Sequence, residues 1–396
     1  MMETEAALKF NYTTMTQDIR CAADAISGIC GALDRVGANT AMVICGPSIL
    51  RHADVVQRVQ EALGNRCVGL FAGVAPHSPV QVLKEAVAIA SDLRPDALVS
   101  VGGGSTHDTT KGIALLLAEG GDIHDYEIRF EPPNKVFIPE TPHEKAPIIS
   151  VPTTMGGAEF SRGGGGFTDK TLGRKIIAAG QGTSHRVVII DGRALATTPM
   201  PIVLSTAIGQ LRIAVETVYS TAHNPIGDGL ALHAIRMLVN YLPRCPGRDL
   251  DVLLNTKTAA CMASLGSVGG LGLNTAIAHH LGGLYDVPHG EANAILLPHT
   301  MRFNLDSSAD RQALIAEAMG IDTSGMTAEE AGLAASDAVA QLCRKLGLPA
   351  TLREVGVPDE GLELIASATL HDRSLATNPK PVADAGPIMQ VLREAW

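Results

Sequence analysis

The sequence lacks the features of a disulfide-bonded, membrane-spanning or nucleic-acid-binding protein. Its seven cysteines are odd in number and form no Cys-x-x-Cys pair, which favours reduced thiols over a disulfide framework or a zinc knuckle. No apolar run approaches the roughly 20 residues of a membrane span. Residues 1–10 lack the layout of a signal peptide, and a formal charge of −10 disfavours nucleic acid and anionic membranes as partners. We therefore expect a cytoplasmic protein that acts on a small molecule.

Aromatic residues are also scarce, at 3%, whereas glycine occurs 41 times. Abundant glycine indicates many tight turns and close backbone approaches. Hydrophobic residues at 46% and charged residues at 18% are typical of a well-packed globular protein. A chain of 396 residues exceeds the usual size of a single core, so two domains are expected.

The first half of the chain alternates strand and helix patterns. Short apolar runs are separated by segments of 10–15 residues with helical spacing, which predicts a parallel sheet with helices on both faces. The glycine-rich stretch 162–167 is expected to be a mobile loop. The predicted strands are 40–45, 68–71, 97–101, 148–151 and 187–190, and the predicted helices are 22–36, 53–63 and 80–93.

The alternation ends near Pro199, in a segment that also contains Thr197, Thr198 and Pro201. Only helical spacing follows, so we predict an α/β Rossmann-type domain over residues 1–198 and an all-helical domain over 199–396. The cleft between them is the default ligand site. The helices expected in the second half are 203–219, 228–241, 250–267, 271–284, 291–303, 311–319, 327–346 and 359–369.

A glycine loop directly follows the strand predicted at 97–101. It runs Val-Gly-Gly-Gly-Ser-Thr-His-Asp-Thr-Thr-Lys-Gly over residues 101–112. Its glycines leave room for backbone N–H groups beside a pyrophosphate, and a helix beginning near Ser105 would direct its positive end there. The string is not a Gly-x-Gly-x-x-Gly fingerprint, and a purely structural turn is an equally good interpretation of this loop alone.

Two further segments carry a family pattern together with this loop. One reads Val-Pro-Thr-Thr-Met-Gly-Gly-Ala-Glu-Phe over 151–160, and the other is the histidine-rich stretch 271–303. With the glycine loop they resemble the iron-containing (group III) alcohol dehydrogenases over essentially the whole chain, and the short Pro-Thr-Thr loop resembles the maleylacetate reductase branch. The resemblance implies a dehydroquinate-synthase-like fold, a nicotinamide cofactor and, as a family property, a homodimer.

The resemblance also implies which residues bind NAD(P). The diphosphate would rest on Gly103, Gly104 and Ser105, with Asp108 beside the loop or merely satisfying the helix dipole. Thr153 and Thr154 would contact the adenine and ribose portion, and Met155 would lie near the nicotinamide. Lys175 matches a lysine that faces the cofactor, although a lone lysine is more often solvated.

Cofactor choice is indicated at the end of the first predicted strand. NAD-specific members of the family carry an aspartate at this position, which repels a 2′-phosphate. Here Gly46 occupies it. Because the excluding carboxylate is absent, we expect NADPH to be accepted, with NADH as the alternative cofactor.

The resemblance fails at the metal ligands. The four positions that hold an Asp and three His in the family are here Gly209, Ile213, Thr275 and His289. One histidine beside a hydroxyl is too few for a catalytic divalent ion, which needs about three protein ligands. The sequence therefore predicts no catalytic metal.

The chemistry of the lost ion would pass to other groups. Arg212, one turn from Gly209, could place a guanidinium in the vacated space, or could pair with Glu216 on an exposed helix face. His279 and His289 are candidate proton donors, with satisfied core histidines as the alternative. We thus expect a metal-independent NAD(P)H-dependent oxidoreductase that reduces a carbonyl, or a carbonyl-conjugated double bond, of a small substrate, for which an anionic keto acid is one candidate class. A metal-dependent alcohol dehydrogenase with rearranged ligands and a non-redox nucleotide-binding protein are the alternatives.

Overall fold

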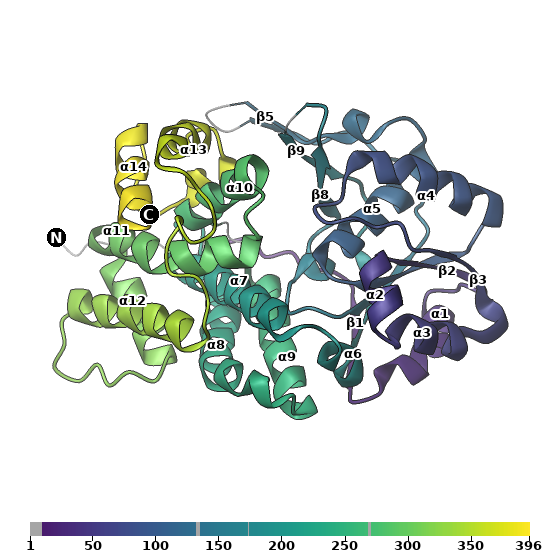
Figure 1. Ribbon diagram of the computed structural model, residues 1–396, viewed down its shortest axis with the longest axis horizontal. Helices are drawn as coiled ribbons and strands as arrows, with labels where there is room; N and C mark the ends of the chain where they lie inside the picture. The colour runs from purple at the N-terminus through teal and green to yellow at the C-terminus, as the bar shows by residue number, and fades with distance from the viewer. Residues whose placement is uncertain (1–9, 132–134, 173, 268–270) are drawn as a thin grey trace.

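The computed structural model describes residues 10–131, 135–172, 174–267 and 271–396. It consists of an α/β part, purple to blue at the right of Figure 1, and a helical part, green to yellow at the left. This arrangement confirms the predicted fold class. Residues 1–9, which belong to the segment predicted to lack a signal peptide, lie outside the described residues. The division of the chain between residues 198 and 199 remains a prediction.

A six-stranded parallel sheet with the order β1-β10-β7-β4-β2-β3 forms the centre of the α/β part. The inner strands β2, β4 and β7 are buried along their whole length because helices cover both faces, as their uninterrupted apolar runs require. All five predicted strands are present. The strands of the sheet are β1 (Asp18–Ala22), β2 (Ala41–Cys45), β3 (Cys67–Phe71), β4 (Ala97–Gly102), β7 (Ile148–Pro152) and β10 (His185–Asp191).

Two antiparallel hairpins lie outside this sheet. The first pairs β5 (Arg129–Glu131) with β6 (Lys135–Phe137), and the second pairs β8 (Gly164–Asp169) with β9 (Arg174–Ala179). The prediction of a loop over 162–167 was therefore wrong. Four glycines in succession gave no strand pattern, and pairing with β9 supplies the order that the local sequence does not.

Helices of the α/β part largely follow the predicted spacing. The predicted helix 22–36 was wrong in its first half, where β1 ends at Ala22 and a 3-10 turn, η1 (Ala25–Gly28), precedes the α-helix. The helices are α1 (Ile29–Arg35), α2 (Pro47–His52), α3 (Val55–Leu63), α4 (Val80–Leu93), α5 (Gly104–Glu119) and α6 (Gly192–Ala196).

The helical part contains all the helices predicted for it. The segments 291–303 and 311–319 are two helical stretches of α11 that meet at a non-helical residue, Ser308, as the two separate predictions implied. A final amphipathic helix was not predicted. The helices are α7 (Met200–Tyr219), α8 (Pro225–Tyr241), α9 (Leu250–Gly266), α10 (Leu273–Tyr285), α11 (His289–Ala318), α12 (Ala328–Lys345), α13 (Leu362–Thr369) and α14 (Ala385–Glu394).

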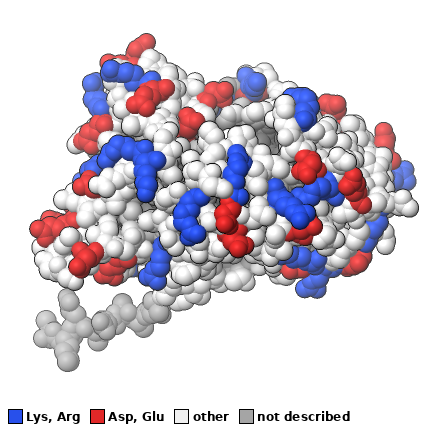
Figure 2. Space-filling model, turned by 60° about the horizontal axis from the view of Figure 1, so that its bottom comes forward, with Lys and Arg blue, Asp and Glu red and all other residues white. Residues whose placement is uncertain are grey.

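Helix α7 is 20 residues long and apolar enough to cross a membrane, which the sequence analysis did not anticipate. However, 83% of its apolar window is buried inside the protein, so it is a core helix. On the face shown in Figure 2, Lys and Arg are interspersed with Asp and Glu rather than gathered by sign. The cytoplasmic location and the absence of nucleic-acid and membrane partners remain predictions.

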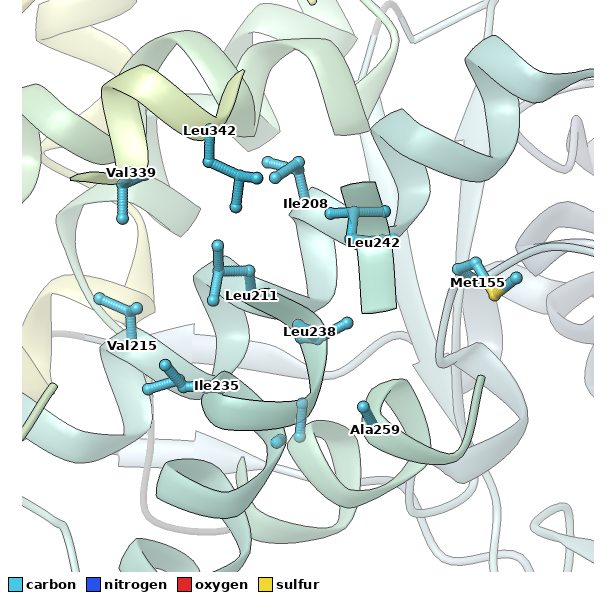
Figure 3. Packing of buried hydrophobic residues seen from close by; sticks show 14 of the residues in the cluster. Met155, Ile208, Leu211, Val215, Ile235, Leu238, Leu242, Ala259, Val339 and Leu342 are labelled. Atoms are coloured by element: carbon cyan, nitrogen blue, oxygen red, sulfur yellow. The ribbon is translucent and has the colours of Figure 1, made fainter. Parts of the chain in front are cut away.

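The largest hydrophobic cluster lies among α7, α8, α9, α11 and α12. Ile208, Leu211 and Leu238 lie within it, and Met155 enters it from the loop that follows β7 (Figure 3). The α/β part thus contributes a side chain to the core of the helical part. This contact matters for the site because the same loop carries the Pro-Thr-Thr motif.

Candidate active site at the junction of the two parts

The glycine loop joins β4 to α5 at the carboxyl edge of the sheet. Gly102 has φ 154°, and a Cβ there would lie 2.4 Å from Thr106 Oγ1. A Cβ at Gly103 would lie 2.9 Å from Thr154 Cγ2. Both positions therefore need glycine for close packing. Helix α5 begins at Gly104, so its unpaired N–H groups and positive dipole end lie at this edge of the sheet. The geometry fits a dinucleotide diphosphate.

A neighbouring turn supports the glycine loop. The Ser105 hydroxyl accepts a hydrogen bond from His77 N at 3.0 Å, and Ser78 Oγ donates to Ser105 O at 3.0 Å. His77 also contacts the helical part, because its Nε2 lies 3.1 Å from Asp286 Oδ1. An ion pair that forms when His77 is protonated thus links the diphosphate loop to the residue that ends α10.

The Pro-Thr-Thr segment begins beside the glycine loop because Pro152 of β7 is in register with Gly102 of β4. Thr153 N donates to Gly102 O at 2.9 Å, and the methyl group of Thr154 packs over Gly103. Met155 is fully buried in the helical core. The prediction that Met155 lies near the nicotinamide was therefore wrong for its side chain, which is buried in the core of the helical part.

Gly46 lies at the same edge of the sheet, between the end of β2 and the start of α2. A Cβ at this position would lie 3.1 Å from Val74 O, so a side chain there requires a small backbone adjustment. The residue adds no negative charge to the crevice, as the sequence analysis expected. Its part in cofactor choice remains a prediction.

A cavity of about 1090 Å³ opens between the β8–β9 hairpin and α10. Asp108 and Lys175 line it from the α/β part and His279 lines it from the helical part. Asp108 accepts hydrogen bonds from Gly166 N at 3.1 Å and from Lys111 Nζ at 3.4 Å, so it also anchors the hairpin. Lys175 is exposed to the cavity, and no partner is recorded for its ammonium group among the described residues.

Arg212 projects into the region of the four metal-ligand positions. Only 3% of the residue is exposed, and its Nη1 donates to Glu216 Oε2 at 3.2 Å and to Thr275 Oγ1 at 2.6 Å. Its Nη2 lies 3.3 Å from His289 Nε2. Since a guanidinium can only donate, Nε2 of His289 is the acceptor and the neutral ring carries its proton on Nδ1. The sequence left two alternatives for Arg212. In the structure Arg212 forms the ion pair with Glu216, but the pair is buried and not on an exposed helix face. Arg212 also contacts Thr275 and His289, which occupy two of the four metal-ligand positions.

The electrostatics of this cluster follow from burial. Desolvation lowers the pKa of Arg212, although Glu216 opposes this effect. One side of His289 is exposed to solvent, and protein atoms surround the rest of its ring. This enclosure, followed by the charge of Arg212, holds the pKa of His289 well below its usual range. The imidazole beside Arg212 is therefore neutral at physiological pH.

The donor set does not fit a divalent metal. Gly209 and Ile213 offer no donor atom, and the Thr275 hydroxyl is committed to Glu216, to which it donates. A fixed cation, Arg212, contacts both remaining positions. Among the described residues, no group of three or more His, Cys, Asp or Glu could hold an ion. The chemistry of these side chains therefore disfavours a divalent metal at this position.

His279 lies between this cluster and the cavity. Its ring stacks on His289 with centroids 6.0 Å apart and planes 14° apart. Its Nδ1 lies 2.8 Å from Asp372 Oδ2. Burial alone would raise the pKa of Asp372, but the hydrogen bond from His279 and the charge of that ring hold it at about 2. A carboxylate that is ionised at physiological pH thus orients His279, and directs its Nε2 away from Asp372.

Sequence reasoning missed Asp372 and Asn293. Asp372 is 93 residues from His279, and no local pattern connects them. Asn293 is fully buried with its amide nitrogen 3.5 Å from the position of a Gly209 Cβ, and neither of its polar atoms has a partner among the described residues. The i, i+4 spacing of His289 and Asn293 on α11 was the available signal for Asn293. Its amide fills the space that a side chain at Gly209 would take.

Comparisons with known proteins agree with this geometry. Residues 16–192 match the family described as iron-containing alcohol dehydrogenase, and residues 203–396 match the C-terminal domain of the Fe-containing alcohol dehydrogenase family. The chain is 30% identical to the NAD-dependent methanol dehydrogenase of Bacillus methanolicus over 92% of this chain and 94% of the relative. A crystal structure of 1,3-propanediol oxidoreductase superposes with a TM-score of 0.89 and 28% identity, covering 98% and 100% of the two chains. The maleylacetate reductase of Agrobacterium tumefaciens superposes with a TM-score of 0.80 and 25% identity, covering 98% of each chain.

Proposed function

Because the chain belongs to the iron-containing alcohol dehydrogenase family, and is therefore an oxidoreductase, we propose that it reduces the carbonyl group of a small anionic keto acid with NAD(P)H and without a catalytic metal. A carbonyl-conjugated double bond is the related substrate group. The observation that carries the proposal is the buried guanidinium of Arg212, bound to Thr275 and His289 at two of the four ligand positions.

The α/β part has the features needed to hold the cofactor. The N–H groups at the start of α5 would bind the diphosphate, and Gly103 leaves room for it. Thr153 and Thr154 follow on the adjacent strand, so the cofactor can extend from the sheet edge toward the cavity that Lys175 and His279 line. When bound, the reduced nicotinamide supplies the hydride that the carbonyl carbon accepts.

The helical part would act on the carbonyl oxygen. His289, held neutral with its proton on Nδ1, is a fixed hydrogen-bond donor, and the positive charge of Arg212 behind it stabilises developing negative charge. His279, oriented by Asp372, would in its protonated form transfer the proton from Nε2 to the oxygen. In this scheme Arg212 is a positioning residue. It is 3% exposed and acts through His289.

The lining of the cavity supports an anionic substrate. Lys175 from β9 and Arg373 from the helical part both line it, and neither has an ion-pair partner recorded among the described residues. The two acids of the lining, Asp108 and Asp372, already have partners in Lys111 and His279. Arg162 also lines the cavity and has no ion-pair partner among the described residues. Three available cations in a protein with a net charge of −10 would select a carboxylate over a neutral aldehyde.

The test is consumption of NADPH and NADH by purified protein, followed at 340 nm with 2-keto acids, 4-oxo acids and neutral aldehydes, each with and without a strong chelator. We expect turnover that is insensitive to chelator, that favours the keto acids, and that occurs in protein without stoichiometric zinc or iron by elemental analysis. Loss of activity with chelator, restored by added metal, would instead establish a metal-dependent dehydrogenase with rearranged ligands. Nucleotide binding without turnover of any substrate would favour a non-redox role.

A further inference from the structure

We infer that Lys257, in the helical part, is a positioning residue that fixes the segment 153–159 and with it the nicotinamide end of the cofactor relative to His279 and His289. The inference rests on the proposed function, because it assumes that a nicotinamide cofactor lies at this edge of the sheet. Lys257 is not part of any motif identified in the sequence.

The contacts of Lys257 cross between the two parts of the molecule. The residue lies on α9 and is fully buried. Its Nζ donates to Gly156 O at 2.5 Å and forms an ion pair with Glu159, whose side chain is also buried. The ammonium group also lies 5.5 Å from the centre of the Phe160 ring. A buried ammonium is costly unless it is paired, so these contacts strongly favour one position of the segment.

The same pair reaches the strand that carries the glycine loop. The second carboxylate oxygen of Glu159 lies 3.8 Å from His107 Nε2, and His107 Nδ1 lies 2.9 Å from Ser100 Oγ on β4. Burial, opposed by Glu159 and reinforced by Lys257, lowers the pKa of His107 to about 4, so the ring is neutral. The chain of contacts runs from α9 through the 153–159 segment to β4.

The rest of the segment is packed against the helical part just as tightly. Met155 N donates to Thr206 Oγ1 at 3.1 Å, and the Met155 side chain lies in the helical core. A Cβ at Gly157 would lie 1.9 Å from Ser264 Oγ, which shows how closely α9 approaches the backbone. Among the residues of the helical part that contact this segment, Lys257 carries the charge. It binds the carbonyl of Gly156, which lies between Met155 and Gly157 in the chain.

The consequence concerns the distance between hydride donor and acceptor. The cavity that His279 lines is also lined by Ala158 and Ser161, so the segment borders the space where the reacting ring must lie. A misplacement of about 1 Å can reduce the rate about 10²-fold. Loss of the Lys257 contacts should therefore alter the nicotinamide end of the site while the diphosphate and adenine end is unchanged.

The experiment compares the binding of NADH with that of ADP-ribose, which lacks the nicotinamide. Lys257→Met alone would leave Glu159 buried without a partner, so the main variant is Lys257→Met with Glu159→Gln, and Lys257→Arg is the conservative variant. We expect the Kd of ADP-ribose to stay within threefold of the unmutated protein in the double variant. The Kd of NADH should rise at least tenfold, kcat should fall about 10²-fold, and Lys257→Arg should restore part of both losses.

A second buried lysine–glutamate pair provides the matched control. Lys145 and Glu119 form an ion pair of similar burial beside a 380 Å³ pocket of the α/β part, and among the described residues neither forms a hydrogen bond or ion pair with the segment 153–159. Lys145→Met with Glu119→Gln should lower the thermal midpoint comparably and leave the NADH to ADP-ribose ratio unchanged. The inference is overturned if that ratio is unchanged in the Lys257 double variant, or if the Lys145 control alters it equally. Because binding is measured directly, either result is distinct from failure of the proposed reaction, which the substrate panel reports.

Discussion

Removal of the Arg212 charge should abolish most of the activity, but the obvious variant would not show why. Arg212 and Glu216 are 3% and 0% exposed, so Arg212→Ala leaves a buried carboxylate without its partner. That change costs about 3–5 kcal/mol of stability, well above the value of an exposed helix pair. The informative variant is Arg212→Met with Glu216→Gln, which removes both charges, keeps the volume similar and leaves Thr275 an acceptor.

The expected loss in the double variant is about 10²–10³ in kcat, the range for a missing group that stabilises a developing oxyanion. KM should change little, because Arg212 has almost no surface for substrate contact. Arg212→Lys should recover part of kcat, since one ammonium group cannot reproduce the three contacts to Glu216, Thr275 and His289. Steady-state kinetics and urea unfolding of the same preparations provide the measurements. A stable double variant with kcat within threefold of the unmutated enzyme would refute the reasoning.

Three further predictions concern the cofactor crevice and the buried histidines. Gly104→Leu should abolish NAD(P)H binding in a titration while the thermal midpoint is kept. Gly104→Ala should be tolerated by the fold, because its Cβ would meet only Ala158, at 3.7 Å. Unchanged affinity of the Leu variant would show that the loop is only a turn. Gly46→Asp should shift the NADPH/NADH preference toward NADH by about 1–3 kcal/mol, measured as the ratio of kcat/KM values, and an unaltered ratio would remove Gly46 from the ribose site. Burial lowers the pKa of His107 to about 4 and that of His185 well below its usual range, so the unfolded chain binds protons below about pH 6.5 that the folded chain does not. Stability should accordingly fall as the pH drops from 6.5 toward 4, by up to about 2.7 kcal/mol per pH unit from these two protons, in addition to the contribution of His289. His185→Phe should lower the slope measured in urea unfolding by up to about 1.4 kcal/mol per pH unit, and an identical slope would contradict the assignment.

The sequence was sufficient for the fold because its signals were local and repeated. Each apolar run such as 97–101 indicates one strand, and each stretch of helical spacing after Pro199 indicates one helix. The Pro-Thr-Thr and glycine motifs add the resemblance to a known fold. The hairpin β8–β9 was missed because half of its first strand is glycine, which gives no strand pattern, and the order of this strand comes from its pairing with β9. The edge strand β1 was missed because its charged and polar residues hide the apolar pattern.

The site could be predicted only where the identity of a single residue decides its chemistry. The absence of donor atoms at Gly209 and Ile213 is visible in the sequence. The burial of Arg212 is not, because it depends on α10 and α11 closing over α7 from 63 and 77 residues away. The partners Asp372 and Lys257 likewise lie about 100 residues from the groups they orient, at distances where spacing carries no information.

The pairing of β1 with β10 has a consequence for biosynthesis. Asp18 of β1 is in register with Val187 of β10, so the N-terminal edge strand has no partner until the ribosome has made the whole α/β part. At about 5–20 residues per second, that interval is roughly 10–30 s. Non-local pairing of this kind also folds slowly. During synthesis β1 therefore stays unpaired for longer than any other strand of the sheet. The dependence of the folding yield on chaperones should be greatest for substitutions that weaken β10.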